Sequence, residues 1–310
     1  MKRLVSLNDI SHDEWLMYRK KGITGTDAGA IVGLNPYTSA FDVYMDKVTK
    51  EVKEKEDNEA MRLGRDMEEY VARRFCEETG MKVRRANAIY QNDDYEFMLA
   101  DYDRLIVGAQ AGLECKTVSP YLQDKWKDGA IPLHYQMQVQ HYLAVSGYDC
   151  WYVAALIYGR EFIIRKIKRD EEVISNLITI ESRFWKENVC KQNIPDPDGS
   201  DNYTDAIANL YRNAKTDKAI ELFGYEEQLN RRQELMQLID KLEKEKTEID
   251  QEIKLQMKDA AYAQADRFRV SWTNTDSQRL DSKKLKEEAP EIYNKYSKVI
   301  SSRRFTVKVA

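Results

Sequence analysis

The order of helical and strand patterns over residues 1–190 limits the chain to a fold with a mixed central sheet. Apolar residues recur every four positions over residues 60–79, which predicts a helix that ends at Gly80. A second helical pattern covers residues 133–146 and ends at Gly147, and patterns typical of strands follow each helix. This order predicts an α/β or α+β fold whose helices flank the sheet.

A linker signal divides the chain into two parts. The segment NIPDPDGSDN, residues 193–202, contains both Pro and Gly, and we expect it to join a core over residues 1–195 to a C-terminal part over residues 196–310. In that part, apolar residues at alternating four- and three-residue steps predict a helical arm over about residues 225–258. Packing of this arm in a two-helix element is favoured over dimerisation.

Two strictly alternating segments near the end of the chain predict a small αβ element. They are RFRVSW (residues 267–272) and RFTVKV (residues 304–309), and they bracket a helical pattern over residues 282–299. Because alternation is the period of a strand, we expect the two segments to pair with each other.

Composition excludes several classes of protein. No apolar run reaches the roughly 20 residues that a membrane-spanning helix needs, and the first residues lack the apolar stretch of a signal peptide. The 4 cysteines lie far apart and the 3 histidines form no zinc pattern, so we expect no disulfides, no zinc and a cytoplasmic location. The net charge of −4 argues against a protein that only coats DNA, whereas an enzyme with several carboxylates around a metal ion fits it.

Charged residues interrupt a segment that otherwise has the pattern of a buried strand, GLECKTV (residues 112–118). Residues two apart share a face of a strand, so Glu114 and Lys116 point the same way, whereas Cys115 points into packing. Asp103 lies eleven residues before Glu114, a separation that one hairpin turn can fold back. Two carboxylates at neighbouring strand ends suit Mg²⁺, and an adjacent lysine can steady the charge on a phosphate. The spacing therefore indicates metal-assisted phosphodiester hydrolysis.

Each of these residues also has an ordinary interpretation. A Glu-x-Lys triplet is often an exposed ion pair on an edge strand, although the apolar neighbours of Glu114 weigh against that here. Glu68 shares a four-residue spacing with Gly64 and Ala72, small residues that would let its helix approach the sheet. By itself, however, that glutamate is better explained as a solvated side chain. Gln138 lies beside the apolar stripe of its helix, where it is either half-exposed or orients water or phosphate.

Four blocks of sequence, in the same order, resemble one nuclease family. They are RKKGITGTDAGAIVGLNPYTS (residues 19–39), GRDMEEYVARRF (residues 64–75), LADYDRLIV with GLECKT (residues 99–107 and 112–117), and WKDGAIPLHYQMQVQHYLAVSG (residues 126–147). With these blocks the chain resembles the YqaJ family of phage-type recombination nucleases, relatives of lambda exonuclease within the PD-(D/E)xK superfamily. The resemblance implies a restriction-endonuclease-like core.

The resemblance also implies a role for each candidate residue. The catalytic set comprises an acid on the first long helix, two acids and a lysine on strands, and a glutamine on the second helix, which map to Glu68, Asp103, Glu114, Lys116 and Gln138. The two strand acids would bind the metal together with the backbone carbonyl of Cys115, and Asp101 is an alternative to Asp103. Arg19 and Thr26 would contact the 5′ phosphate of DNA. Thr26 also suits the N-cap of a helix, where anions bind favourably.

For function, the resemblance implies a Mg²⁺-dependent exonuclease, with Mn²⁺ as a substitute metal. It would degrade one strand of linear double-stranded DNA from the 5′ end and leave a 3′ overhang. A ring of three subunits would enclose the DNA, and a single-strand annealing protein of the RecT type would load the exposed strand. Two alternatives stay open: an endonuclease of the same superfamily, and a DNA-binding or adaptor protein that keeps the fold without chemistry. The complete acidic set favours the enzyme.

Overall fold

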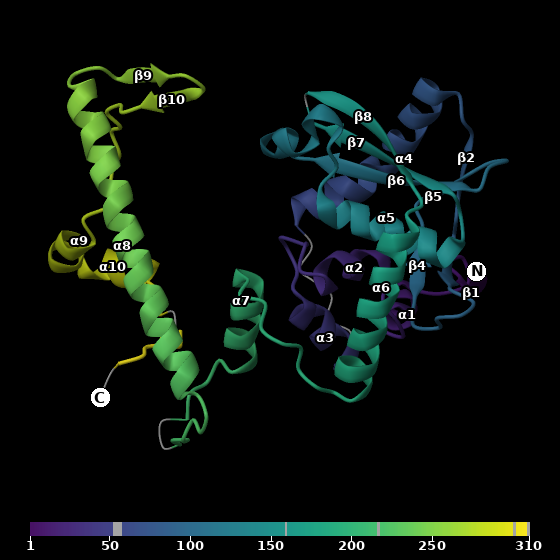
Figure 1. Ribbon diagram of the computed structural model, residues 1–310, viewed down its shortest axis with the longest axis horizontal. Helices are drawn as coiled ribbons and strands as arrows, with labels where there is room; N and C mark the ends of the chain where they lie inside the picture. Colours follow the sequence, from purple (N-terminus) through teal and green to yellow (C-terminus); the bar gives the residue numbers. More distant parts are fainter. Residues whose placement is uncertain (52–57, 159, 216–217, 300–301, 309–310) are drawn as a thin grey trace. The chain divides into compact units, whose positions relative to one another are not determined.

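The chain forms two compact units, Met1–Tyr211 and Arg212–Ala310, in the computed structural model. The structure describes residues 1–51, 58–158, 160–215, 218–299 and 302–308. The first unit contains a five-stranded and a three-stranded sheet with helices around them. The second contains a long helix, a hairpin and two short helices (Figure 1).

The elements of the first unit follow the predicted order of helices and strands. Its strands are β1 (Lys2–Ser6), β2 (Val83–Arg85), β3 (Ala88–Gln91), β4 (Leu99–Asp101), β5 (Arg104–Ile106), β6 (Ala111–Val118), β7 (Cys150–Ile157) and β8 (Glu161–Lys168). Its helices are α1 (His12–Arg19), α2 (Gly25–Ile31), α3 (Ala40–Val48), α4 (Glu59–Thr79), the 3₁₀ segment η1 (Pro120–Gly129), α5 (Leu133–Ser146), α6 (Glu171–Arg183), the π-helix η2 (Phe184–Cys190) and α7 (Asp201–Leu210). Gly80 and Gly147 adopt the left-handed conformation that ends α4 and α5, as predicted.

The main sheet has the strand order β2-β5-β6-β7-β8 (Figure 1). β6 and β7 run parallel, whereas the other neighbouring pairs run antiparallel, so the sheet is mixed. A parallel pair needs a crossover connection, and α5 lies in the segment that makes it. The mixed central sheet with flanking helices confirms the predicted fold class.

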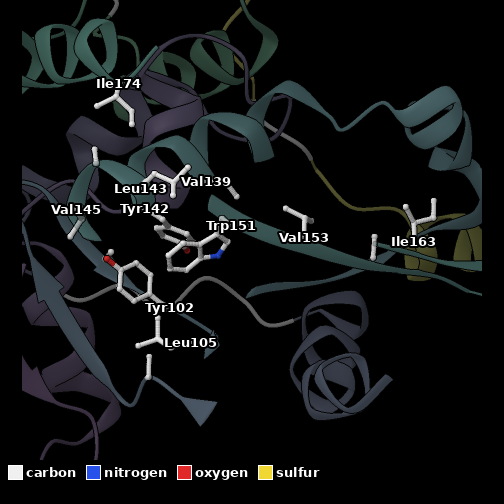
Figure 2. Packing of buried hydrophobic residues seen from close by; sticks show 14 of the residues in the cluster. Tyr102, Leu105, Val139, Tyr142, Leu143, Val145, Trp151, Val153, Ile163 and Ile174 are labelled. Atoms are coloured by element: carbon white, nitrogen blue, oxygen red, sulfur yellow. The ribbon is translucent and has the colours of Figure 1, made fainter. Parts of the chain in front are cut away.

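Helices cover both faces of the main sheet. Phe75 of α4 belongs to one apolar cluster with Leu113 of β6 and Ala154 of β7. On the other face, Tyr142 of α5 and Trp151 of β7 pack with their ring centroids 5.4 Å apart (Figure 2). Successive side chains of β6 therefore face different helices, and this alternation sets the direction of the charged residues on that strand.

The first unit extends past the expected boundary at residue 195 because α7 packs on α3. The ring centroid of Tyr203 lies 5.0 Å from that of Phe41, and the Tyr203 hydroxyl donates a hydrogen bond to the carbonyl of Pro195 at 2.6 Å. The side-chain amide of Asn202 donates to the carbonyl of Pro36 at 3.1 Å. The Pro- and Gly-containing segment is thus followed by a helix that belongs to the first unit.

The second unit begins with the long helix and ends with short elements. They are α8 (Glu226–Met257), β9 (Tyr262–Ala265), β10 (Phe268–Ser271), α9 (Ser282–Glu288) and α10 (Pro290–Tyr296). α8 coincides with the expected helical arm. The helix expected over residues 282–299 is broken before Pro290, since a proline disfavours the helical conformation of the residue before it.

The expected pairing of RFRVSW with RFTVKV differs from the structure. β10 pairs with β9 through a short turn in which Asp266 has a φ of 48°. Residues 302–308 form no strand, and Val309 lies outside the described residues. A local hairpin closes a far shorter loop than the expected pairing would, so it costs less conformational entropy. In the described part of the chain, no helix combines the length and the apolar character that crossing a membrane would require.

Candidate active site

Glu114 is the buried centre of the candidate active site. It lies on β6, its side chain is turned to α5, and only 4% of its surface is exposed. Its Oε1 atom accepts hydrogen bonds from Lys116 Nζ at 2.6 Å and from Gln138 Nε2 at 2.7 Å. β6 and α5 therefore bring together three of the predicted residues, and the pair on β6 is no exposed ion pair of an edge strand.

The second carboxylate oxygen of Glu114, Oε2, is buried and has no hydrogen-bond partner among the described residues. Leaving a buried polar group without a partner costs on the order of 1–3 kcal/mol, and more when the group is charged. A cation bound at this atom would offset that cost. The unpartnered oxygen is thus an observation that points to a ligand.

Asp103 lies between β4 and β5 and faces the backbone of β6. Its Oδ2 atom accepts a hydrogen bond from the N–H of Cys115 at 2.8 Å, so the hairpin turn folds back as its spacing predicts. Burial raises the pKa of the Asp103 carboxyl well above its usual value, and the negative charges of Glu114 and Glu68 raise that pKa further. Acidic groups that destabilise one another in this way are stabilised together by a bound cation.

Cys115 points away from these carboxylates, as the alternation predicts. Its side chain packs against the apolar cluster below α4. Burial raises the pKa of the Cys115 thiol far above its usual value, and the charge of Asp103 acts in the same direction. The thiol is therefore protonated at neutral pH, which leaves the backbone carbonyl as the group that Cys115 could offer a metal ion.

Lys116 carries its charge in spite of being largely buried. Burial lowers the pKa of its amine, but the negative charge of Glu114, with Tyr135 and Asp103, outweighs burial and holds that pKa above its usual value. The Nζ atom also lies 4.7 Å from the ring centroid of Tyr135, within range of a cation–π interaction. An ammonium group is thus fixed beside Glu114.

Gln138 is buried rather than half-exposed. Besides its bond to Glu114, its Nε2 atom donates to the hydroxyl of Tyr142 at 2.8 Å. Tyr142 is a site residue that the sequence interpretation missed, although its position four residues after Gln138 places it on the same face of α5. A Cβ atom at Gly25 would lie 2.3 Å from Cε1 of Tyr142, so the approach of α2 to this ring requires glycine.

Glu68 lies on α4 and is bound by Arg104, a second residue that the sequence interpretation missed. Arg104 is only 3% exposed and forms an ion pair with Glu68. It also donates to Glu69 Oε2 at 3.0 Å and to the carbonyl of Asp103 at 2.7 Å. Glu68 is therefore no freely solvated side chain, and its negative charge lies close enough to influence Asp103. In the sequence Arg104 directly follows the candidate aspartate, and that position alone does not identify Glu68 as its partner.

Arg19 and Thr26 lie together in a second polar cluster at the start of α2. The Nη2 atom of Arg19 donates to Thr26 Oγ1 at 3.0 Å, and its Nη1 atom forms an ion pair with Asp101. Asp101 is therefore turned to Arg19, whereas Asp103 lies beside β6. Between the two alternatives for a metal ligand, the geometry favours Asp103.

The expectation that Thr26 is an N-cap is wrong. Thr24 is the N-cap of α2, and its backbone N–H and its hydroxyl both donate to Asp27 Oδ2, at 2.8 Å and 2.9 Å. Thr26 lies in the first turn of the helix, and its hydroxyl is 3.2 Å from that of Thr24. Both threonine hydroxyls are thus oriented around the guanidinium of Arg19.

The residues that could hold a metal ion form a small set. Within the described ranges, there is no group of three or more His, Cys, Asp or Glu residues arranged to bind a metal ion. The expected ligands are two carboxylates, those of Asp103 and Glu114, and the carbonyl of Cys115. Mg²⁺ commonly takes one or two carboxylates and completes its shell with water and phosphate oxygens. With the unpartnered oxygen of Glu114, this set fits Mg²⁺.

Known proteins resemble the chain in sequence. A family model described as the YqaJ-like viral recombinase domain matches residues 14–149. A protein of Bacillus subtilis (strain 168) named "Uncharacterized protein YqaJ" is 38% identical over 308 residues, which cover 98% of this chain and 97% of that protein. This likeness extends through both compact units.

Solved structures resemble the chain in fold. The alkaline exonuclease LHK-Exo from Laribacter hongkongensis has a TM-score of 0.50 and 20% sequence identity, over 58% of this chain and 93% of that chain. The structure of LHK-Exo in complex with dAMP gives the same values. At this identity the likeness bears on the fold alone, and it confirms the expected restriction-endonuclease-like core.

Proposed function

Since the chain belongs to the family of YqaJ-like viral recombinases, we propose that it is a Mg²⁺-dependent exonuclease that degrades one strand of linear double-stranded DNA from the 5′ end. The 3′ overhang that remains would serve single-strand annealing in phage-type homologous recombination. Family membership confirms the resemblance found in the sequence, whereas metal, polarity and pathway belong to the proposal.

One observation carries the proposal: Asp103, Glu114 and Lys116 converge around the middle of β6. The two carboxylates influence each other electrostatically, and one of them keeps a buried oxygen without a partner. In an ion pair with a purely structural role, buried polar atoms are normally all hydrogen-bonded, so an unpartnered carboxylate oxygen would not be expected. The cluster is therefore better explained as a site that receives a cation and a phosphate.

Each residue of the cluster has a role in the proposed hydrolysis. Asp103, Glu114 and the carbonyl of Cys115 would hold the metal ion. The chemistry that a bound Mg²⁺ supplies is neutralisation of charge at the scissile phosphate and activation of water for attack. Lys116 Nζ, already charged and oriented, would donate a hydrogen bond to the phosphate as negative charge builds on it. Gln138 would keep the Glu114 carboxylate in one orientation through its bond to Oε1.

Arg19 and Thr26 would bind the 5′ phosphate at the end of the DNA strand. The guanidinium and the Thr26 hydroxyl already lie together, and both are groups that bind phosphate oxygens well. The ion pair of Arg19 with Asp101 would weaken or rearrange when phosphate binds, which makes Asp101 a competitor for the same guanidinium. Recognition of a phosphorylated end would direct the enzyme to 5′ termini.

The proposal includes an assembly and partners. A ring of three copies would enclose the DNA, and an annealing protein of the RecT type would bind the exposed strand in the host cytoplasm. The acidic balance of the chain, −4 overall, supports topological capture, because a ring can stay on DNA without the strongly basic surface that salt-sensitive affinity requires.

Degradation of end-labelled DNA tests this function. Linear duplexes labelled separately at the 5′ and at the 3′ ends are incubated with the protein and Mg²⁺, or with a chelator. With Mg²⁺ we expect the 5′ label to be released early and the 3′ label to stay on the DNA. With chelator we expect neither label to be released. Asp103→Asn should abolish release while DNA binding, measured by fluorescence anisotropy, persists.

The same assay separates the two alternatives. Cleavage of a closed circular duplex at a rate comparable to that of linear DNA would show an endonuclease. Linear duplex that stays intact with Mg²⁺ or Mn²⁺, although it is bound, would show an adaptor that keeps the fold without chemistry. Early release of the 3′ label would contradict the proposed polarity alone.

A further inference from the structure

α8 carries an apolar stripe that is open to solvent. The stripe follows alternating four- and three-residue steps along the helix, with Lys246 at one of the steps, and its apolar residues are Leu235, Ile239, Leu242, Ile249 and Ile253. Each of these side chains is between 37% and 62% exposed. We call these five residues the docking seam. A row of exposed branched apolar side chains of this length is typical of an interaction surface.

The docking seam has the composition of one strand of a two-stranded coiled coil. β-Branched Ile239 and Ile253 repeat at one heptad position, and Leu235, Leu242 and Ile249 repeat at the other. Isoleucine at the first position with mainly leucine at the second is close to the combination that favours two helices. The seam spans about 27 Å along α8, long enough for a paired helix of several turns. Lys246 lies in the same row between the two isoleucines, and a single polar residue there fixes register and partner choice.

From Leu242 to Ile253, the positions that flank the docking seam carry charge of one sign. In its central part the flanking residues are Glu243, Glu245, Asp250 and Glu252. Lys246 lies 3.8 Å from Asp250 in an exposed ion pair, and the other three carboxylates make no ion pair with the described residues. The docking seam is therefore an apolar row with acidic borders.

These borders make a second copy of α8 a poor occupant. In a parallel or an antiparallel pair of identical helices, acidic borders would face acidic borders, and such contacts are destabilising. An in-register parallel pair would also place Lys246 against its own copy. Specific pairing of helices depends on opposite charges at these positions.

We propose that the docking seam binds one helix of another protein, whose own apolar row is bordered by Lys or Arg and carries an acidic residue opposite Lys246. The partner would pair with α8 as a short heterotypic coiled coil. Burial of the apolar row supplies the attraction, and the charged borders select the partner. This inference is independent of the proposed nuclease activity.

Two synthetic peptides of about four heptads test the proposal with the full chain. Both have Ile and Leu in the apolar row and Glu opposite Lys246; one has Lys at the border positions and the other has Glu. By fluorescence anisotropy at about 50 mM salt, the Lys-bordered peptide should bind at least about tenfold more tightly, and the preference should shrink at about 500 mM salt.

Charge reversal and a seam variant complete the test. The combined substitution Glu243→Lys, Glu245→Lys, Asp250→Lys and Glu252→Lys should reverse the preference between the peptides. Leu242→Gln with Ile249→Gln should lose binding of both peptides, whereas Leu255→Gln, which lies off the seam at 74% exposure, should bind as the unchanged chain does. Circular dichroism verifies that each variant keeps its helix content.

Several outcomes would overturn the proposal. They are equal binding of the two peptides, a preference that charge reversal leaves unchanged, and binding that survives in the Leu242→Gln, Ile249→Gln variant. Self-association of the full chain in sedimentation equilibrium that this variant abolishes would assign the seam to a second copy instead.

Discussion

The guanidinium of Arg104 links two glutamates of α4 to the backbone carbonyl of Asp103. An arginine can satisfy three acceptors at once because its donors are arranged in a rigid fork. The position of Glu68 therefore depends on Arg104, and so does the turn that carries Asp103. In the proposed enzyme Arg104 would be a positioning residue.

Replacement of this arginine tests that dependence. Arg104→Met should lower the free energy of unfolding by about 2 kcal/mol, because Glu68 would stay half-buried without its partner while Glu69 can be solvated. The control is Arg62→Met, which removes an exposed ion pair with Asp66 and should cost less than about 0.5 kcal/mol. Urea unfolding measures both, and equal losses would contradict the structural role of Arg104.

A buried ion pair between His141 and Glu181 gives a prediction about pH. Burial lowers the pKa of His141, but Glu181, bound to Nδ1 at 2.9 Å, and the carbonyl of Leu99, bound to Nε2 at 2.9 Å, together raise it above the usual value. Both ring nitrogens face acceptors, so the imidazole is protonated on both. The raised pKa means that this pair contributes its full stability below about pH 6.5, the usual value for the unfolded chain, and loses it as pH rises through the folded-state pKa.

The variant His141→Gln exposes this pH dependence. At pH 6 it should be less stable than the unchanged chain by about 3 kcal/mol, since Glu181 keeps its burial and loses its cation. The difference should shrink as the pH rises through the folded-state pKa of His141, because the unchanged chain then loses the proton of that imidazole. Urea unfolding at several pH values measures it, and a difference that stays constant or grows with pH would contradict the ion pair.

Among the elements, β6 has two faces that differ in the space they leave for an added Cβ atom. One face packs against α4, and the other lies beside Trp151 of β7. A Cβ atom at Gly112 would lie 2.1 Å from Cζ2 of Trp151, whereas one at Gly64 of α4 would lie 3.5 Å from Oγ1 of Thr117. The first distance is a steric overlap and the second is an ordinary contact. Gly64 of α4 therefore has room for a Cβ atom, whereas Gly112 of β6 does not.

Alanine at the two glycines should act in opposite directions. Gly112→Ala should destabilise the chain by about 1–3 kcal/mol through overpacking against Trp151. Gly64→Ala should stabilise it by about 0.5–1 kcal/mol, since alanine is the better helix former. Thermal and urea unfolding measure both changes, and loss of stability in Gly64→Ala would mean that α4 approaches β6 more closely than the structure indicates.

Sequence patterns predicted the elements that are marked by residues within the element itself. α4 and α5 have a regular apolar period and a glycine at the end, so their bounds could be given within one residue. The short strand β1 has too few residues for a pattern, and it is stabilised by β3, which lies far along the chain. The predicted partner of β10 was wrong. Alternation indicates that a segment forms a strand, but it does not indicate which other segment that strand pairs with.

The same limit applies to the candidate site. The spacing of Asp103, Glu114 and Lys116 predicted a common strand face and a hairpin. The position of Gln138 left two roles open, and its catalytic role came from the resemblance. Arg104 could not be found, because an arginine beside an aspartate has many possible partners and only packing selects Glu68. The ion pair of Arg19 with Asp101 is a contact across 82 residues, which no local pattern reports.

At the scale of the whole molecule, the three apolar clusters lie entirely within the first unit. The second unit exposes most of the large apolar residues of α8. Cooperative stability should therefore come from residues 1–211. α7 is part of this stability, since Tyr203 belongs to one of the clusters.

Truncation tests where the first unit ends. A chain of residues 1–211 should unfold in one cooperative transition at nearly the temperature of the same transition in the full chain. A chain of residues 1–195 should lose about 2–4 kcal/mol, because the aromatic contact of Phe41 with Tyr203 is removed from a buried cluster. Differential scanning calorimetry compares them, and equal stability of the two truncated chains would place the boundary at residue 195.

Binding of Mn²⁺, followed by electron paramagnetic resonance, tests whether Asp103 and Glu114 hold one divalent cation at β6, as we propose. We expect one Mn²⁺ site in the full chain, whose affinity for Mn²⁺ falls at least about tenfold in Asp103→Asn and in Glu114→Gln and from which Mg²⁺ displaces Mn²⁺. Asp101→Asn, beside Arg19, should leave that affinity unchanged. Absence of Mn²⁺ binding, or a loss of affinity in Asp101→Asn as large as that in Asp103→Asn, would rule out this metal site.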